Sequence, residues 1–457
     1  MANLVGSLWT AARSLDAQQF GLDVTGKNIA NVNTDGYARR KVNLVEIATG
    51  NGGSDGGVAI AGAPAQRDAF LEARLRGEEP GVALGSAVAN ALSVVQTSLG
   101  QTGQSIDGDL AEFFQSFGVL SQDPTSAIAR ESVISMGVKL AGSFNDMSAR
   151  LDASRTAADT QIKGSLSQIN ELTKQIASLN AAIAGASGTS AESLKDQLSI
   201  AVRSVSKLMS VGVMARSDGG MDITTASGRA LVVGGTPYQV SAVATPPAGM
   251  TAVMLNGTDI TAEIGGGLLG GALQVRDVYI PGYKAQLDEL ANAVVTQVNT
   301  VHATGSDLNG NPGGTFFSPL AAVAGSAAAI AVNPALAANG NLIAASQSGA
   351  VGDNRIAKAL AALAEAPTVG AAGATFTQAW SRIVFQVGSD TKNAAATQQS
   401  HQDILSAVQQ LRDSVSGVSL DDEATALLTF QRGYQANARY FSTINDVLDI
   451  LMMMVNR

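Results

Sequence analysis

The sequence contains no cysteine and only two histidines, and aromatic residues make up just 4% of its 457 residues. Without a thiol, disulfides, Cys-ligated zinc and thiol catalysis are excluded, although the redox compartment stays open. His302 and His401 are far apart, and neither belongs to an HExxH pattern. We expect both to be core or interface histidines. The chain is long enough for two to four domains, and its aromatic-poor 46% apolar content favours slender helical packing.

Positive charge and long hydrophobic runs are also scarce. The net charge is −9, whereas nucleic acids and anionic membranes select Lys- and Arg-rich surfaces. Residues 1–16 lack the pattern of a secretory signal peptide. The longest apolar run, about residues 321–332, is Ala-rich and contains Gly325, so it falls short of a membrane span. We therefore expect a soluble protein without a nucleic-acid or membrane partner.

Fragments that imitate active-site motifs fail on the residues that their chemistry requires. Residues 307–311 begin like an EF-hand loop, but Pro312 replaces the required glycine and Ser318 the bidentate glutamate. The glycine-rich stretch 265–271 is not followed by the Gly-Lys-Ser/Thr of a P-loop. We expect no catalytic, cofactor or metal-binding residues and no small-molecule substrate, so the protein is not expected to be an enzyme.

Both chain ends carry apolar residues at the alternating three- and four-residue steps of a coiled coil. Gln19 and Gly26 interrupt the N-terminal seam, and Asn437 the C-terminal one. The N-terminal seam ends in an Asn-, Asp- and Gly-rich turn, after which Tyr37 starts a new direction. The candidate interaction residues are Val5, Leu8, Leu15, Leu22 and Ile29 on the first seam, Asn31, Asn33, Gly36 and Tyr37 at the turn, and Leu427, Phe430, Tyr434, Phe441, Ile444, Leu448 and Leu451 on the second.

Between these ends, long helical patterns surround a stretch of short alternating runs. A helix is predicted over about 126–184 and another seam over 376–415, whereas residues 211–264 alternate between Gly-Gly and Asn-Gly turns, as β-strands do. The fold class is therefore mainly α with a β insertion, built from paired terminal coiled-coil helices, a long helical bundle and one outer, mostly β domain. Residues 1–36 and 416–457 form the coiled-coil part, 37–210 and 271–415 the helical domain, and 211–270 the β domain.

The commonest explanation of such seams is an amphipathic helix packed on its own domain. Burying a Leu-sized side chain yields about 1.5–3 kcal/mol, whereas ordering each backbone residue costs roughly 1–2 kcal/mol. A lone two-helix seam is therefore marginal. We expect the ends to be largely disordered in the free monomer and to fold when neighbouring subunits cover them.

Residues 26–37, GKNIANVNTDGY, resemble the signature of the flagellar axial family of rod, hook and hook-associated proteins. Residues 416–423, SGVSLDDE, and the nearby Phe430 and Tyr434 resemble the matching C-terminal signature. The stretch 269–310 is similar to the hook-associated members of that family. The resemblance implies a structural, non-catalytic subunit at the junction of hook and filament, which forms a homo-oligomeric ring after type III export.

The same resemblance implies specific partners. These are the hook protein, a second junction protein and a flagellar export chaperone that covers the C-terminal helix, from about Leu427 to Leu451. The protein is expected outside the cell in the flagellum, after a transient cytoplasmic stage. The alternatives are another axial protein, such as the second junction protein, the hook or the distal rod, or a secreted coiled-coil effector. The Ala-rich stretch 321–350 has no role that the sequence indicates.

Overall fold

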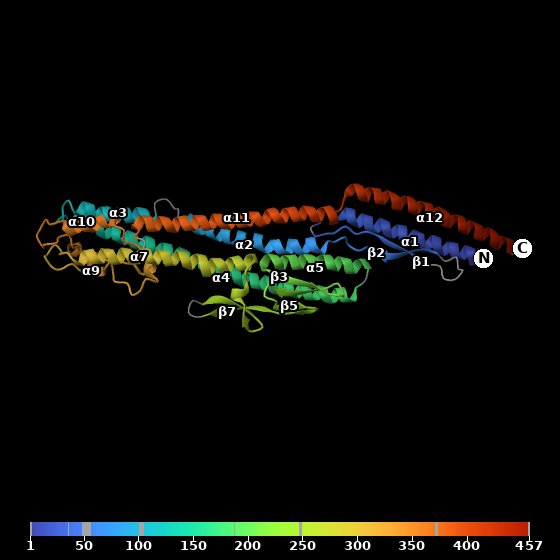
Figure 1. Ribbon diagram of the computed structural model, residues 1–457, viewed down its shortest axis with the longest axis horizontal. Coiled ribbons are helices and arrows are strands. Elements are labelled where there is room, and N and C mark those ends of the chain that lie inside the picture. Colours follow the sequence, from blue (N-terminus) through green and yellow to red (C-terminus); the bar gives the residue numbers. More distant parts are fainter. Residues whose placement is uncertain are drawn as a thin grey trace.

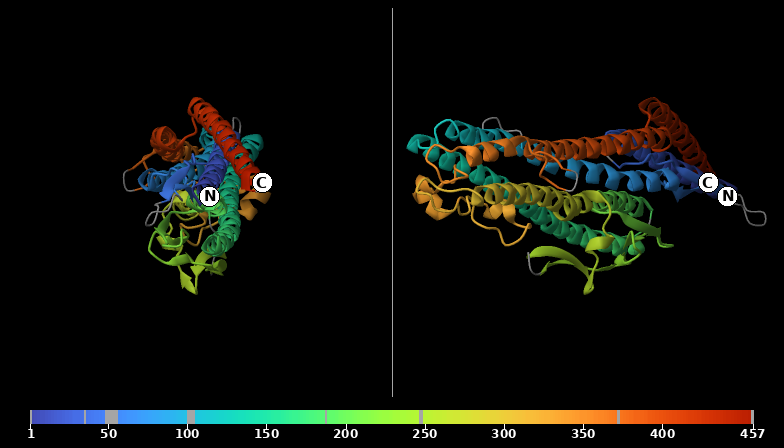
Figure 2. Two further views of the ribbon diagram at one scale, coloured as in Figure 1. Left: turned by 90° about the vertical axis from the view of Figure 1, so that its right-hand side faces the viewer. Right: turned by 60° about the vertical axis from the view of Figure 1, so that its left-hand side comes forward.

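A computed structural model describes residues 2–34, 36–47, 56–99, 105–186, 188–245, 249–370 and 373–455. The molecule is elongated, and both chain ends lie at one tip while a small β domain sits on its flank (Figure 1). The two ends lie side by side in the views of Figure 2 as well. The predicted class, mainly α with a β insertion, is confirmed.

The tip is formed by two antiparallel helices, α1 (Ala2–Ala30) and α12 (Leu420–Val455), which we call the terminal pair. Acidic residues fill the first turn of α12, where negative charge offsets the helix dipole. A β-hairpin packs on the other side of α1; its strands are β1 (Asn43–Ile47) and β2 (Gly57–Gly62). The Thr10 hydroxyl of α1 donates to the Gly56 carbonyl at 2.6 Å and ties the hairpin down.

The body of the molecule, which we call the shaft, is a bundle of long helices. They are α2 (Ala69–Leu99), α3 (Ile106–Leu120), α4 (Ala127–Gly185), α7 (Ile280–Ala303) and α11 (Phe376–Ser416). Helix α4 starts where the Ser126 hydroxyl accepts from the Ala129 N–H, and α11 starts with a capping box between Thr375 and Gln378. Helix α11 is continuous over the whole seam predicted at residues 376–415.

The shaft's helices approach one another closely over small residues. A side chain at Gly81 of α2 would meet the His401 ring at 2.6 Å, and one at Gly85 would lie 2.8 Å from the Gln398 backbone of α11. The two glycines are one turn apart on α2, so a continuous strip of backbone contacts α11. This strip gives α2 and α11 the most extensive contact of any two elements.

A first hydrophobic core fills the end of the shaft far from the termini and centres on phenylalanines. The Phe113 ring lies 5.4 Å from that of Phe316 and 5.3 Å from that of Phe117, in tilted or edge arrangements. Phe376 at the start of α11 stacks on Phe114 at 5.4 Å. These phenylalanines therefore pack together where several elements converge.

The Ala-rich stretch closes this end of the shaft. It contains the short helices α8 (Ser326–Ala329) and α9 (Pro334–Ala338) and buries Ile330 and Ile343 in the first core. The buried Arg130 of α4 donates to the Gly340 and Ile343 carbonyls, at 3.2 and 2.8 Å. The stretch therefore serves as a packed cap, followed by α10 (Arg355–Ala362).

A second core joins the later half of α4, helix α5 (Gly188–Leu208) and the β domain. Two antiparallel sheets follow the strand orders β3-β4-β5-β6 and β7-β8-β9. The strands are β3 (Val211–Ala215), β4 (Met221–Thr225), β5 (Ala230–Val233), β6 (Thr236–Pro237), β7 (Val240–Thr245), β8 (Met250–Leu255) and β9 (Thr258–Asp259). Asp159 of α4 accepts from the Thr251 N–H at 2.8 Å and from Arg276 at 2.8 Å, linking the sheet to the shaft.

Two local features differ from the sequence-based expectation. Helix resumes after the β domain at α6 (Gly267–Gln274), earlier than predicted, and passes through a π-helical turn, η2 (Val275–Tyr279), into α7. The β1–β2 hairpin lies within 37–210, a stretch expected to be helical. Its strands are mostly exposed, so they lack the buried alternation by which a strand is recognised in a sequence.

Candidate assembly interface at the paired chain ends

The terminal pair packs closely at two glycines, one on each helix. A Cβ atom added at Gly21 of α1 would lie 2.4 Å from Phe430 Cδ1 of α12. One added at Gly433 of α12 would lie 2.7 Å from Gln18 Oε1 of α1. The two contacts are reciprocal, because each helix places a large side chain against a glycine of the other. Together they fix the register of the two helices.

The predicted C-terminal seam largely faces α1. Ile444 is buried, Tyr434 is 39% exposed, and the remaining predicted positions are half-buried. Those half-buried residues are Leu427, Phe430, Phe441, Leu448 and Leu451. Tyr434 is displaced because the adjacent Gly433 occupies the close contact.

On α1, the face that is fully buried is not the predicted stripe. Its apolar members are Ala11, Ala17 and Val24, which are mostly small and were not singled out from the sequence. The predicted Leu8, Leu15, Leu22 and Ile29 are half-buried along its edge, and Val5 is 46% exposed. Small residues let the backbones of two helices approach, so the larger leucines flank the contact instead of filling it.

The turn after α1 uses the predicted signature residues in different ways. Asn31 donates to the Lys27 carbonyl at 2.8 Å and accepts from Thr34, so it closes the helix, whereas Asn33 is exposed. Gly36 has a φ of +77°, and a side chain there would lie 2.8 Å from Ile200 of α5. Glycine is therefore required both by backbone conformation and by space.

Next to this turn lies a network of buried and half-buried polar side chains, which we call the joint. It consists of Asn28, Tyr37, Arg39, Arg40, Arg67, Asp196 and Glu423. Asn28 donates to Glu423 at 3.0 Å and to the Arg40 carbonyl at 2.9 Å, and its amide oxygen accepts from the Tyr37 hydroxyl at 2.8 Å. One buried amide thus holds the turn against the start of α12.

Charge pairs complete the joint on both sides. Arg39 Nε donates to Glu423 at 2.7 Å, and Arg40 donates to Asp196 of α5 at 2.8 Å. Arg67, just before α2, pairs with the same aspartate. Burial raises the pKa of the Tyr37 hydroxyl above its usual value. Breaking one partner of a buried pair costs about 3–5 kcal/mol, so these pairs tie the terminal pair to the shaft.

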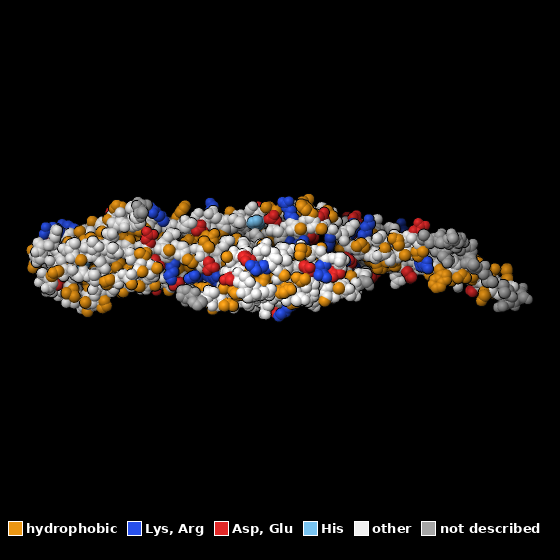
Figure 3. Space-filling view, turned by 60° about the horizontal axis from the view of Figure 1, so that its bottom comes forward, with side chains coloured by type: hydrophobic (Ala, Val, Ile, Leu, Met, Phe, Trp, Pro, Cys, Tyr) orange, Lys and Arg blue, Asp and Glu red, His pale blue; other side chains and the backbone are white. Residues whose placement is uncertain are grey.

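The terminal pair also carries apolar side chains that nothing in the described part of the chain covers. On α1, Trp9 is 61% exposed. On α12, Tyr440, Val447 and Ile450 lie on one flank and are 40–54% exposed. Figure 3 shows hydrophobic side chains reaching the surface at this narrow end of the molecule. Contiguous exposed apolar surface of this kind marks an interaction site.

Comparison with known proteins agrees with this architecture. Residues 92–317 match the helical domain of flagellar hook-associated protein FlgK, residues 8–37 the flagella basal body rod proteins, and residues 409–454 the C-terminal part of the flagellar basal body rod FlgEFG proteins. The chain is 26% identical to Flagellar hook-associated protein 1 of Escherichia coli strain K12, over 99% of this chain and 100% of that one. It is 28% identical to the protein of the same name in Bacillus subtilis strain 168, over 98% of each.

The chain belongs to the flagellar hook-associated protein family. The solved flagellar hook junction protein FlgK of Burkholderia pseudomallei shares the fold, with a TM-score of 0.67 and 18% identity over 75% of this chain and 100% of that one. The prediction of a structural protein of the flagellar hook–filament junction is confirmed. Because the protein belongs to this family, it is located in the bacterial flagellum.

The remaining motifs of this hook-associated protein have structural partners. His302 is fully buried; its Nδ1 lies 2.8 Å from the Gly314 carbonyl, and its Nε2 accepts from the Ala344 N–H at 2.9 Å. Burial lowers its pKa, so the ring stays neutral. His401 contacts Glu78 at 2.8 Å. In the EF-hand-like loop, Asp307 accepts from two N–H groups of its own turn. Among the described residues, no cluster of His, Asp and Glu could hold a metal ion.

Proposed function

We propose that this protein joins hook to filament as a ring of identical, non-catalytic subunits, and that the terminal pair is the part through which it assembles. The observation that carries the proposal is the pair's second apolar surface. One flank of α12 is covered by α1, while Tyr440, Val447 and Ile450 on another stay in solvent. Helices that bury one side in the monomer and leave an apolar flank open fit a packed tube of neighbours.

The layers follow from this placement. Residues 1–36 and 416–457 form the inner part, 37–210 and 271–415 the helical shaft, and 211–270 the outer β domain. Mechanical load on the flagellum then passes from the terminal pair through the joint into α2, α5 and α11. The joint supports this route because its side chains connect α1, α12 and α5 within one hydrogen-bonded network.

The partners proposed are the hook protein on one side of the ring and a second junction protein on the other. Before export by the type III apparatus, a cytoplasmic chaperone covers the Leu427–Leu451 face of α12. This face supports such an exchange, because in the folded chain the same seam is covered by α1. While the chain passes through the export channel, α1 and α12 are not paired, so another protein has to cover the apolar face of α12. The exported protein then resides outside the cell.

Electron microscopy of isolated hook–filament structures, with a label on this chain, tests the proposal. We expect a single labelled band at the junction. A label spread along the hook or the filament, or absent from both, contradicts it. A deletion from Asp446 onward is expected to abolish filament growth, because it removes Val447, Leu448, Ile450 and Leu451 together. Normal filaments in that strain would refute the role of the terminal pair.

A further inference from the structure

Methionine is distributed unevenly over the surface of the molecule. Among the described residues, only four methionine side chains are more exposed than buried. Met214 lies in the β domain and is 59% exposed, whereas Met452, Met453 and Met454 follow one another near the end of α12 and are 64–70% exposed. No charged residue follows Asp449 in α12. The end of the terminal pair is therefore an apolar surface made mostly of thioethers.

One of these three methionines extends the apolar flank of α12 that α1 leaves uncovered. This open flank consists of Tyr440, Val447 and Ile450. An α-helix has about 3.6 residues per turn, so residues seven positions apart lie nearly in line. Tyr440, Val447 and Met454 have this spacing, and Ile450 comes one turn before Met454. Met453 is roughly 100° further around the helix and lies off the flank.

A methionine suits an apolar contact of this kind and also makes it vulnerable. Its flexible, polarizable thioether adapts to irregular apolar surfaces. Hydrogen peroxide oxidises an exposed methionine to the sulfoxide. A lone pair of the sulfur attacks one peroxide oxygen, the O–O bond breaks, and the departing hydroxide takes the proton of the new S–OH group to form water. The sulfur loses two electrons, which the peroxide gains, and an apolar side chain becomes polar.

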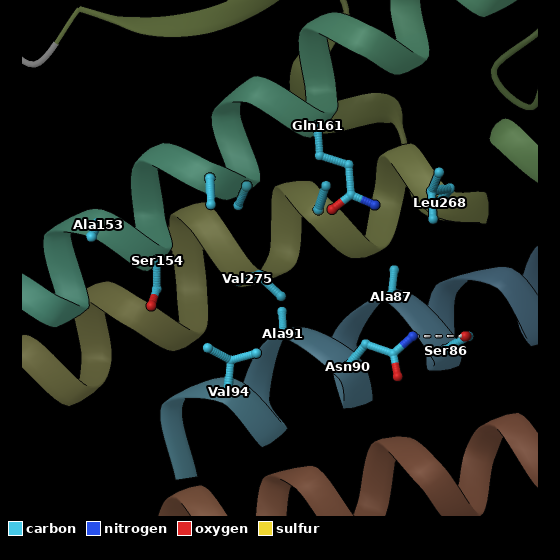
Figure 4. A pocket seen from close by; sticks show the side chains of 13 residues that line it. Ser86, Ala87, Asn90, Ala91, Val94, Ala153, Ser154, Gln161, Leu268 and Val275 are labelled. Atoms are coloured by element: carbon cyan, nitrogen blue, oxygen red, sulfur yellow. Dashed lines mark hydrogen bonds between the residues drawn. The ribbon is translucent and has the colours of Figure 1, made fainter. Parts of the chain in front are cut away.

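The oxidant has few other targets on this chain. The sequence has no cysteine, so no thiol competes for peroxide. An apolar groove of about 430 Å³ opens on the shaft between α2 and α4 (Figure 4). Its lining lies entirely in the described part of the chain, is mostly alanine and includes no methionine. Peroxide therefore changes the polarity of the terminal pair and leaves this surface of the shaft apolar.

We infer that Met454 is an oxidation-sensitive assembly contact. In a subunit that has not yet joined the ring, peroxide converts its thioether to the sulfoxide. Burying the polar group on the open flank is then unfavourable, so the oxidised subunit is not incorporated. In the assembled ring, a neighbouring subunit covers Met454 and protects it. The inference rests on the proposed function, because it requires that the open flank be buried on assembly.

Oxidation of the free chain and of isolated junctions under the same peroxide treatment tests the protection. Trypsin releases residues 440–457 as one peptide, and its fragmentation in a mass spectrometer assigns the sulfoxide to a single methionine. We expect Met454 to oxidise readily in the free chain and slowly in the junction, because susceptibility follows exposure. Met214 is the internal control and should oxidise in both samples. A Met454 that reacts equally in the two samples overturns the inference.

Substitutions test the consequence for assembly. Purified full chain is added to isolated hooks, and labelled junctions are counted by electron microscopy. Met454→Gln places a polar amide where the sulfoxide forms and should be incorporated about tenfold more weakly, because burial of an apolar side chain is lost. Met453→Gln is the matched control, since that residue is 70% exposed against 69% for Met454 but lies off the open flank. It should be incorporated as well as the wild type.

Peroxide treatment is expected to stop incorporation of the wild type but not of Met454→Leu, which stays apolar and has no sulfur to oxidise. Methionine sulfoxide reductases for both sulfoxide epimers, supplied with a thiol reductant, should restore the oxidised wild type. Oxidised wild type that joins hooks normally, a loss that the reductases do not reverse, or glutamine variants that behave alike overturn this inference alone. Untreated wild type that fails to join hooks overturns the proposed function itself.

Discussion

Replacing Glu423 by glutamine should loosen the terminal pair while leaving the shaft intact. The carboxylate is 3% exposed and accepts from Arg39 on one oxygen and from Asn28 on the other. A glutamine retains one acceptor oxygen, but its amide nitrogen would then face either Asn28 or Arg39. Both of these groups are donors, so no hydrogen bond can form there. The substitution therefore removes a charge-assisted hydrogen bond and creates an unpaired buried donor.

The magnitude follows from the geometry. Loss of a hydrogen bond to a charged group costs about 1.5–3 kcal/mol. Arg39 is 29% exposed and keeps Asp422 at 3.3 Å, so it stays partly compensated, and we expect about 2 kcal/mol. Amide hydrogen exchange of the full chain measures this loss of stability as faster local opening of the terminal pair. Two kcal/mol corresponds to about 30-fold faster exchange in α1 and the first turns of α12, with no change in α4.

Asp421→Asn is the matched control, because it removes the same charge from the same helix turn at an exposed position. Both substitutions weaken the favourable interaction with the helix dipole, but only Glu423 belongs to the joint. If the two variants exchange at equal rates, the joint does not hold the terminal pair on the shaft.

Three further perturbations test other parts of the molecule. Gly21→Ala should destabilise the terminal pair by about 1–3 kcal/mol through overpacking, seen as faster limited proteolysis of the ends, whereas Gly26→Ala, which meets nothing within 4 Å, should not. His302→Gln should flatten the pH dependence of the free energy of unfolding. Burial lowers the pKa of the His302 ring in the folded protein, so the wild type loses stability as the pH falls below about 6.5. The loss is roughly 1.4 kcal/mol per pH unit until the ring protonates. Denaturant titrations at pH 7 and 5.5 compare the two. Asp159→Ala should cost about 3 kcal/mol, because it takes from the buried Arg276 one of its two carboxylate partners; unchanged thermal unfolding would contradict that.

The helices and the β insertion could be predicted because their signals are local. Heptad steps, the Asp-rich start of α12 and the Gly-Gly turns each act within a few residues, so periodicity and turn chemistry locate them. The face of α1 could not be predicted in the same way. A hydrophobic count selects Leu8 and Leu15, whereas the close contact is made by Gly21, whose contribution is the absence of a side chain.

The joint was beyond reach for a different reason. The two signatures of the resemblance contain Asn28, Tyr37 and Glu423, but they do not show which residues pair; Asn28 and Glu423 are 395 positions apart. No spacing rule brings such residues together, because the fold of everything between them decides it.

That separation has a consequence for the order in which the protein folds. Closing a flexible loop of about 400 residues costs roughly 5 kcal/mol of chain entropy before any contact is gained. Once α2 lies against α11, the connections that remain to α1 and α12 are far shorter than the separation of the two ends in the sequence. The shaft therefore forms first, and the two ends find each other last. A helix made roughly 400 residues before its partner waits for that partner during synthesis, and until then both remain available to other proteins.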